Sequence, residues 1–198
     1  MTQSKQYDYI IIGNGLAGFQ LALAISQDPY FNNKQIALID RSLKTQNDKT
    51  WSFWEKGTGK WDSIVSKSWN EALVFTRKKE LSLKLTPYTY KTIHALDFYT
   101  KAKEILEEKL NFSFIIEDVL SVENSIHPKV LTTKNSYVAR HIFDSRVTED
   151  YFSKFNNYTK IIQHFKGWII ETDLPVFNTD QFTMMDYRLK DGDQTTFT

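Results

Sequence analysis

The chain has 198 residues, of which 41% are hydrophobic and 25% are charged, and its net charge is +1. This length suits one large domain, or one domain with part of a second, and the ordinary composition excludes a largely disordered protein. The balanced charge excludes a long-range field that favours nucleic acid, and the absence of cysteine excludes disulfides and cysteine-ligated zinc.

The composition also limits where in the cell the protein resides and which ligands it binds. A cysteine-free chain fits a reducing cytoplasm, where we expect the protein. The histidines lack metal-ligand spacing, so we expect no metal site. The most apolar stretch, residues 9–25, is interrupted by glycines and suits neither a signal peptide nor a membrane span. Any membrane contact should therefore be peripheral, and nothing in the pattern indicates an oligomeric state.

The N-terminal region predicts one βαβ unit. Residues 7–12 form a short apolar, β-branched run that ends at a glycine, as is typical of a buried parallel strand. Residues 16–26, rich in alanine and leucine, predict a helix. Residues 35–39 predict the next strand, which closes on Asp40. The unit has the expected length of about 30 residues.

The middle of the chain departs from a simple repetition of this unit. Residues 41–59 predict a long polar loop that carries the aromatic side chains of Trp51, Phe53 and Trp54. The pattern beyond this loop predicts a strand pair inserted within about residues 60–95, a helix over 96–110, and strands at 112–116, 119–122 and 137–143.

The residue pattern changes after residue 151, where strand-like runs dominate. We expect an α/β protein whose Rossmann-like nucleotide-binding domain covers residues 1–150, followed by the start of a β-rich substrate domain over residues 151–198. The chain stops as a further strand begins, which we interpret as truncation.

Three glycines follow the first predicted strand in the pattern Gly13-x-Gly15-x-x-Gly18. The first permits a tight turn, the second lets the backbone approach a pyrophosphate, and the third allows close packing of helix on strand. The diphosphate would lie at the helix N-terminus, where free N–H groups and the helix dipole favour an anion. Asp40 ends the second strand and is placed to accept from ribose hydroxyls. The pattern predicts a dinucleotide site.

The choice between NAD and FAD depends on the residues beyond the βαβ unit. An NAD domain should continue directly with βα repeats, whereas this chain inserts a loop, a strand pair and a helix before residues 139–146 return as a sheet strand with a polar turn. Flavoproteins use such a return to approach the cofactor again, so FAD is favoured.

Several segments together resemble the lycopene cyclase family, the flavoproteins that form the β-ionone rings of carotenoids. The residues at 9–18 are generic to flavin folds, whereas Thr-Trp-Ser-Phe-Trp at 50–54 is more specific. The remaining matches are Phe-Asp-Ser-Arg at 143–146, Gln-His-Phe-Lys-Gly-Trp at 163–168 and Met-Met-Asp-Tyr-Arg at 184–188. The resemblance spans essentially the whole chain and points to bacterial β-cyclases.

The resemblance implies an FAD-binding fold of the glutathione-reductase and aromatic-hydroxylase type, interleaved with a β-rich substrate domain. It also implies an isomerisation: a terminal double bond of lycopene is protonated, the ring closes through a carbocation, and a proton is lost. Reduced FAD would be required and NAD(P)H would keep it reduced. The lipophilic polyene substrate implies an enzyme at the membrane surface.

The resemblance also implies roles for particular residues. Val119 would approach the adenine through its backbone, and Asp144, Ser145 and Arg146 would lie near the flavin side. The diphosphate and ribose contacts would come from Gly13, Asn14, Gly15, Leu16, Ala17, Gly18, Asp40 and Arg41. The acidic motif that supplies the family's catalytic acid is expected beyond Thr198, so no catalytic residue is assigned.

Other interpretations stay open. Trp51, Phe53, Trp54 and Trp168 are candidates for an apolar substrate tunnel, but equally for core, and Asp186 with Arg188 favours a structural pair. Besides a cyclase, the chain is compatible with an FAD-dependent monooxygenase or a geranylgeranyl-reductase-like enzyme, or with a non-catalytic nucleotide-binding fragment.

Overall fold

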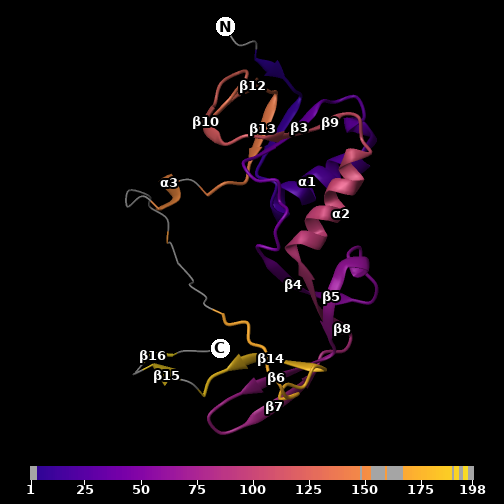
Figure 1. Cartoon of the computed structure of the whole chain (residues 1–198), viewed down its shortest axis with the longest axis vertical. Coiled ribbons are helices and arrows are strands. Elements are labelled where there is room, and N and C mark those ends of the chain that lie inside the picture. Colours follow the sequence, from indigo (N-terminus) through magenta and orange to yellow (C-terminus); the bar gives the residue numbers. More distant parts are fainter. Residues whose placement is uncertain are drawn as a thin grey trace. The chain divides into compact units, whose positions relative to one another are not determined.

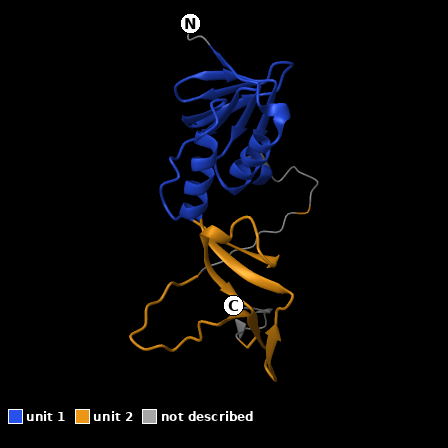
Figure 2. Ribbon diagram, turned by 90° about the vertical axis from the view of Figure 1, so that its right-hand side faces the viewer, with its two compact units in different colours: residues 1–48, 95–157 blue, residues 49–94, 158–198 orange. Residues whose placement is uncertain are grey.

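The computed structural model describes residues 4–147, 149–152, 159, 167–188, 190–191 and 194–195. The chain divides into two compact units (Figure 2). Unit 1 contains residues 1–48 and 95–157, and unit 2 contains residues 49–94 and 158–198. The insertion expected within the nucleotide-binding domain therefore groups with the C-terminal residues. It also begins earlier than expected, at residue 49.

Unit 1 is built on a four-stranded parallel sheet in the order β13-β2-β3-β9 (Figure 1). A second sheet in the order β1-β12-β11-β10 belongs to the same unit. The strands of unit 1 are β1 (Lys5–Gln6), β2 (Tyr9–Ile12), β3 (Ile36–Asp40), β9 (Phe112–Ile116), β10 (Val119–Glu123), β11 (Lys129–Thr132), β12 (Ser136–Val138) and β13 (His141–Asp144). Its helices are α1 (Leu16–Gln27), the 3-10 turn η1 (Pro29–Phe31), α2 (Ala95–Glu107) and α3 (Glu149–Phe152).

Alternation along the parallel strands gives the sheet two buried faces. One face packs Ile10, Ile12 and Ile39 against Val130 and Tyr137 of the second sheet. On the helical side, Phe19 of α1 lies against the rings of Phe98 and Tyr99 of α2 and of Phe114 of β9. Neither α1, of 12 residues, nor any other helix in the described ranges reaches the length and hydropathy that a membrane crossing requires.

The predicted strand over residues 137–143 is wrong in one respect, because it is two strands in different sheets. β12 pairs with β11, whereas β13 pairs with β2. The chain passes between the sheets at Ala139 and Arg140, whose N–H groups donate to the carbonyls of Pro128 and Asp8. The polar residues Arg140 and His141 interrupt an otherwise strand-like run at this switch, and the local pattern does not reveal it because Tyr137 and Ile142 pack on the same core.

Unit 2 contains three small sheets, in the orders β4-β8-β5, β14-β6-β7 and β15-β16. Its elements are β4 (Thr50–Lys56), η2 (Asp62–Ile64), β5 (Val65–Trp69), β6 (Glu71–Phe75), β7 (Glu80–Lys84), β8 (Tyr88–His94), β14 (Gln181–Asp186), β15 (Lys190–Asp191) and β16 (Gln194–Thr195). The insertion thus holds five strands rather than the expected pair. Residues 50–56 were expected within a polar loop but form the strand β4. Their side chains alternate between half-buried and exposed positions with a period of two, which is the period of a strand.

The ammonium group of Lys91 braces the turn after β4. Its Nζ donates to Glu55 Oε2 at 2.8 Å, to Asp62 Oδ1 at 2.5 Å and to the Gly57 carbonyl at 3.1 Å. The hydrogen bond to Asp62, followed by that to Glu55, raises the pKa of Lys91, whereas that of Asp62 is lowered chiefly by the same bond. All three donors are therefore satisfied by acceptors that hold residues 55–62 together.

We expect Lys91→Met to lower the melting temperature, because it leaves two carboxylates facing each other without a cation. Lysine with a raised pKa stabilises the fold below its ordinary value of 10.5. The advantage of the wild type should thus be full at neutral pH and should shrink as pH rises through the raised pKa. Thermal unfolding between pH 7 and pH 11 measures this. The exposed Lys84→Met on β7 is the matched control, and equal melting of the two variants would contradict the brace.

Candidate cofactor site

The turn between β2 and α1 brings two backbone segments unusually close. Gly13 has φ +94°, a left-handed conformation that glycine tolerates, and a Cβ there would lie 2.3 Å from Ser145 Oγ. A Cβ on Gly18 would lie 1.9 Å from the Gly13 carbonyl oxygen. Ser145 Oγ donates to the Ile12 carbonyl at 2.8 Å, so the turn after β13 supports the turn after β2.

Gly15 differs from both, because a Cβ there would meet no atom within 4 Å. It is the N-cap of α1, no side chain caps the first turn, and that turn contains no acidic residue. The neighbouring Asn14 is 1% exposed, and its Oδ1 has no hydrogen-bond partner among the described residues. Open space and uncapped N–H groups together fit an anionic group that accepts hydrogen bonds there. The unsatisfied Asn14 Oδ1 is an acceptor, so it would take a hydrogen bond from a donor such as a hydroxyl group.

The carboxylate of Asp40 ties this turn to the loop after β3. Its Oδ2 accepts from the Asn14 N–H at 2.7 Å, and its Oδ1 accepts from the Ser42 N–H at 2.8 Å. Lys44 Nζ lies 3.3 Å from the same Oδ2, and Lys44 itself has φ +53°. Asp40 is thereby fixed with acceptor capacity remaining, since a carboxylate offers about four lone-pair positions.

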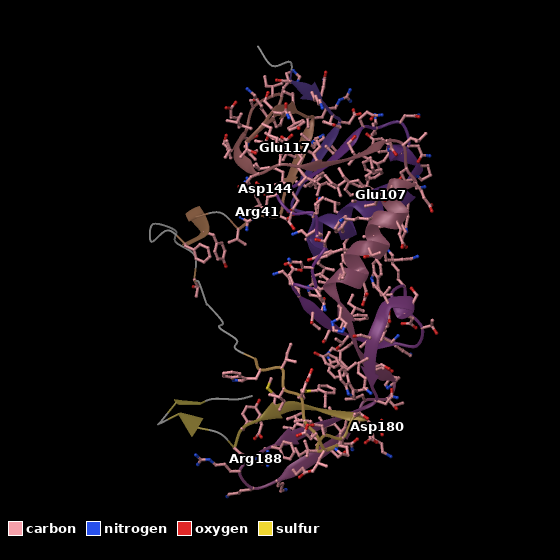
Figure 3. All side chains as sticks on the ribbon, in the orientation of Figure 1. Arg41, Glu107, Glu117, Asp144, Asp180 and Arg188 are labelled. Carbon is pink, nitrogen blue, oxygen red and sulfur yellow. The ribbon has the colours of Figure 1, made fainter. Side chains whose placement is uncertain are left out.

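A cavity of about 370 Å³ opens beside Asp40 within unit 1. It lies at the carboxyl ends of β2 and β3, where open parallel sheets bind ligands. Its lining residues are Ile12, Gly13, Ile39, Asp40, Arg41, Lys44, Glu117, Asp118, Val119, Arg146 and Val147. Arg41, Glu117 and Asp144 are labelled at this end of the sheet in Figure 3.

Arg146 joins two walls of this cavity. Its Nε and Nη2 donate to both oxygens of Asp144, at 2.9 and 2.8 Å, and its Nη1 donates to the Val119 carbonyl at 2.7 Å. Burial acts to raise the pKa of Asp144, but the hydrogen bonds and charge of Arg146 outweigh it, so the pKa is lowered. The pair is ionised at neutral pH and holds β13 against the start of β10.

Most sequence-predicted cofactor residues meet at this place. Gly13, Asp40, Arg41, Val119 and Arg146 line the cavity. Residues 14–18 form the adjoining turn and helix start. Asp144 accepts from Arg146, and Ser145 donates to the Ile12 carbonyl, so both contact lining residues. Arg146 was expected on the flavin side and Val119 on the adenine side, yet the structure joins them by a hydrogen bond.

Six lining residues were missed: Ile12, Ile39, Lys44, Glu117, Asp118 and Val147. Glu117 and Asp118 had a detectable signal, because they follow the carboxyl end of the half-buried parallel strand β9 just as Asp40 ends β3. Lys44 carried no such signal in the sequence, because its approach to the cavity depends on a left-handed turn that the local sequence does not require.

The three residues of β4 that were proposed for a substrate tunnel do not share one face of the strand. On β4, Trp51 and Phe53 lie on one face and Trp54 on the other, as strand alternation requires. Trp168 is 81% exposed. Trp54 instead belongs to a cluster with Trp69, Tyr90 and Phe182, in which the Tyr90 ring centroid lies 4.6 Å from those of Trp54 and Phe182.

Two further motifs that carry the family resemblance lie in unit 2, and the structure describes them in part. Arg188 donates to both oxygens of Asp186, and its guanidinium lies 3.9 Å from the Phe75 ring centroid, so the pair joins β14 to β6. This geometry agrees with a structural role. Gln163, His164, Phe165 and Lys166 lie outside the described residues.

The sequence was compared with protein families and with curated proteins. The family described as "Lycopene cyclase protein" matches residues 8–198. No curated protein sequence matches the chain.

Solved structures share the fold at low identity. PqsL, a probable FAD-dependent monooxygenase from Pseudomonas aeruginosa, is 10% identical with a TM-score of 0.52, over 70% of this chain and 42% of its own. The flavin-dependent brominase Bmp2 is 13% identical with a TM-score of 0.55, over 76% and 40%. The halogenase PltM, solved with phloroglucinol and FAD, is 12% identical with a TM-score of 0.53, over 71% and 34%. The chain thus spans less than half of each, and the likeness shows that it has the mixed α/β fold of FAD-dependent enzymes.

Proposed function

Because this chain belongs to the lycopene cyclase family, we propose that it supplies the FAD-holding region of a lycopene β-cyclase. The proposed reaction converts the ends of lycopene into β-ionone rings without net oxidation or reduction, in the formation of β-carotene. The enzyme is proposed to work in the cytoplasm at the membrane surface, where its lipophilic substrate resides, with NAD(P)H as the reductant of its cofactor. The fold is proposed to be of the glutathione-reductase and aromatic-hydroxylase type.

The single observation that carries the cofactor assignment is the cavity at the ends of β2 and β3. The turn that adjoins this cavity fits FAD: the open Cβ position of Gly15 leaves room for a diphosphate, and the uncapped start of α1 offers N–H donors to it. Asp40 would accept from ribose hydroxyls, and the backbone of Val119 would face the adenine. When bound, reduced FAD would supply an electron-rich ring that stabilises the developing carbocation.

Cyclisation can be tested directly with the full-length protein. Lycopene in liposomes is incubated with the enzyme, FAD and NADPH, and the carotenoids are separated by chromatography. We expect cyclic product that accumulates without stoichiometric consumption of NADPH, because the reaction is an isomerisation. A protein that binds FAD yet leaves lycopene unchanged would refute the substrate but retain the cofactor.

A redox enzyme is the second candidate, favoured by the likeness of the fold to FAD-dependent monooxygenases and halogenases. The same assay separates the two. Oxygenated or reduced product, formed with one NADPH per turnover, would replace the cyclase by a monooxygenase or a prenyl reductase.

A further inference from the structure

The cavity wall formed by residues 117–119 is anchored at every residue. The Glu117 N–H donates to the Asp40 carbonyl at 3.0 Å, and the Asp118 carbonyl accepts from the Thr133 N–H at 2.9 Å. The Val119 carbonyl accepts from Arg146 at 2.7 Å. This short connection between β9 and β10 is thus fixed to both neighbouring loops and to the β11–β12 hairpin.

The strongest anchor of this wall is the Glu117 side chain. Its Oε1 accepts from Asn135 Nδ2 at 2.7 Å and from the Tyr137 hydroxyl at 3.0 Å, and its Oε2 accepts from the Thr132 hydroxyl. The three donors are uncharged and come from β11, β12 and the turn between them. Thr132 is 4% exposed and Tyr137 is 1% exposed, so the network reaches from the cavity into the core.

The network keeps its charge state near neutral pH. Burial acts to raise the pKa of Glu117, but the hydrogen bonds from Thr132, Asn135 and Tyr137 outweigh it and the pKa is lowered. Burial, and then the bond to Glu117, raise the pKa of Tyr137 to about 12. An ionised acceptor therefore faces protonated donors, and such charge-assisted bonds are stronger than neutral ones.

We propose that Glu117 is a positioning residue that fixes the wall contacting the adenosine half of the dinucleotide, and so sets the affinity for that half. The inference rests on the proposed FAD site. Glu117 touches Asp40 through its backbone and directly precedes Asp118 and Val119, so a shift of this residue displaces the ribose acceptor and the adenine wall together. The carboxylate accepts from all three donors at once, whereas glutamine has one accepting oxygen and would present N–H to at least one of them.

The test is Glu117→Gln, with FAD and ADP as probes in titration calorimetry below the melting temperature of the variant. We expect the dissociation constants for FAD and ADP to rise by the same factor, about tenfold, because one charge-assisted bond of the wall is lost. Glu123→Gln, on the exposed end of β10, is the matched control and should bind both ligands like the wild type.

A purely structural role predicts a lower melting temperature with unchanged dissociation constants, and that result would overturn the proposal. Weaker FAD binding with unchanged ADP binding would overturn it too, because the effect would then act on the flavin half. Should Glu117→Gln fail to fold, Tyr137→Phe removes one donor and keeps the ring, and about threefold weaker ADP binding is expected; unchanged binding would overturn the proposal. A wild type that binds neither ligand would instead refute the proposed function.

Discussion

Alanine at Gly15 is expected to abolish tight FAD binding while the protein stays folded. A Cβ at Gly15 meets no protein atom within 4 Å, and its φ of −84° suits alanine. The methyl group would instead stand between the first N–H groups of α1 and the phosphates. Losing one or two charge-assisted hydrogen bonds should raise the dissociation constant for FAD at least about 100-fold.

Alanine at Gly18 provides the comparison, because its Cβ would lie 1.9 Å from a backbone oxygen that cannot move away alone. Overpacking of this kind costs roughly 3 kcal/mol, which should lower the melting temperature by roughly 10 °C. Flavin fluorescence titration and thermal unfolding measure the two effects. If Gly15→Ala bound FAD like the wild type, the diphosphate would not lie at this helix terminus.

Replacing Asp40 by asparagine should weaken FAD binding about 100-fold. The carboxylate accepts from the N–H groups of Asn14 and Ser42 on separate oxygens, and an amide can serve only one of them. The variant therefore loses a ribose acceptor and also releases one of the two loops. Both effects act on the cavity, so the fold of the sheet should persist.

The control for Asp40→Asn is Asp28→Asn, at the other end of α1. Asp28 accepts from the Tyr30 N–H in an exposed turn outside the cavity. Its loss should change stability slightly and the FAD dissociation constant not at all. Equal loss of affinity in both variants would mean that Asp40 acts through general stability rather than through the site.

The local residue pattern was sufficient to predict the βαβ unit and the position of Asp40. The run over β2, the glycine spacing and the position of Asp40 are all set within a stretch of about 30 residues, where turn sterics and strand burial dominate. The same reasoning applied to β9 would have drawn attention to Glu117. It was missed because only residues matching a known nucleotide pattern were assigned to the site.

The insertion shows where local pattern fails. The many polar residues within 41–59 suggested a loop, although the alternation along β4 fits one strand of a sheet with one covered face. The grouping of residues 49–94 with 158–198 rests on the parallel pairing of β6 with β14. No local preference encodes a partner so distant in the chain.

That pairing constrains how the protein is made. Glu71 is matched with Gln181, 110 positions later, so the ribosome needs roughly 5–20 s to deliver the second strand after the first has been synthesised. During this interval the β6–β7 hairpin has an open edge with unpaired N–H and C=O groups, and such edges recruit other strands. The nascent chain should therefore be most prone to aggregation, and most dependent on chaperones, between the emergence of β7 and the arrival of β14.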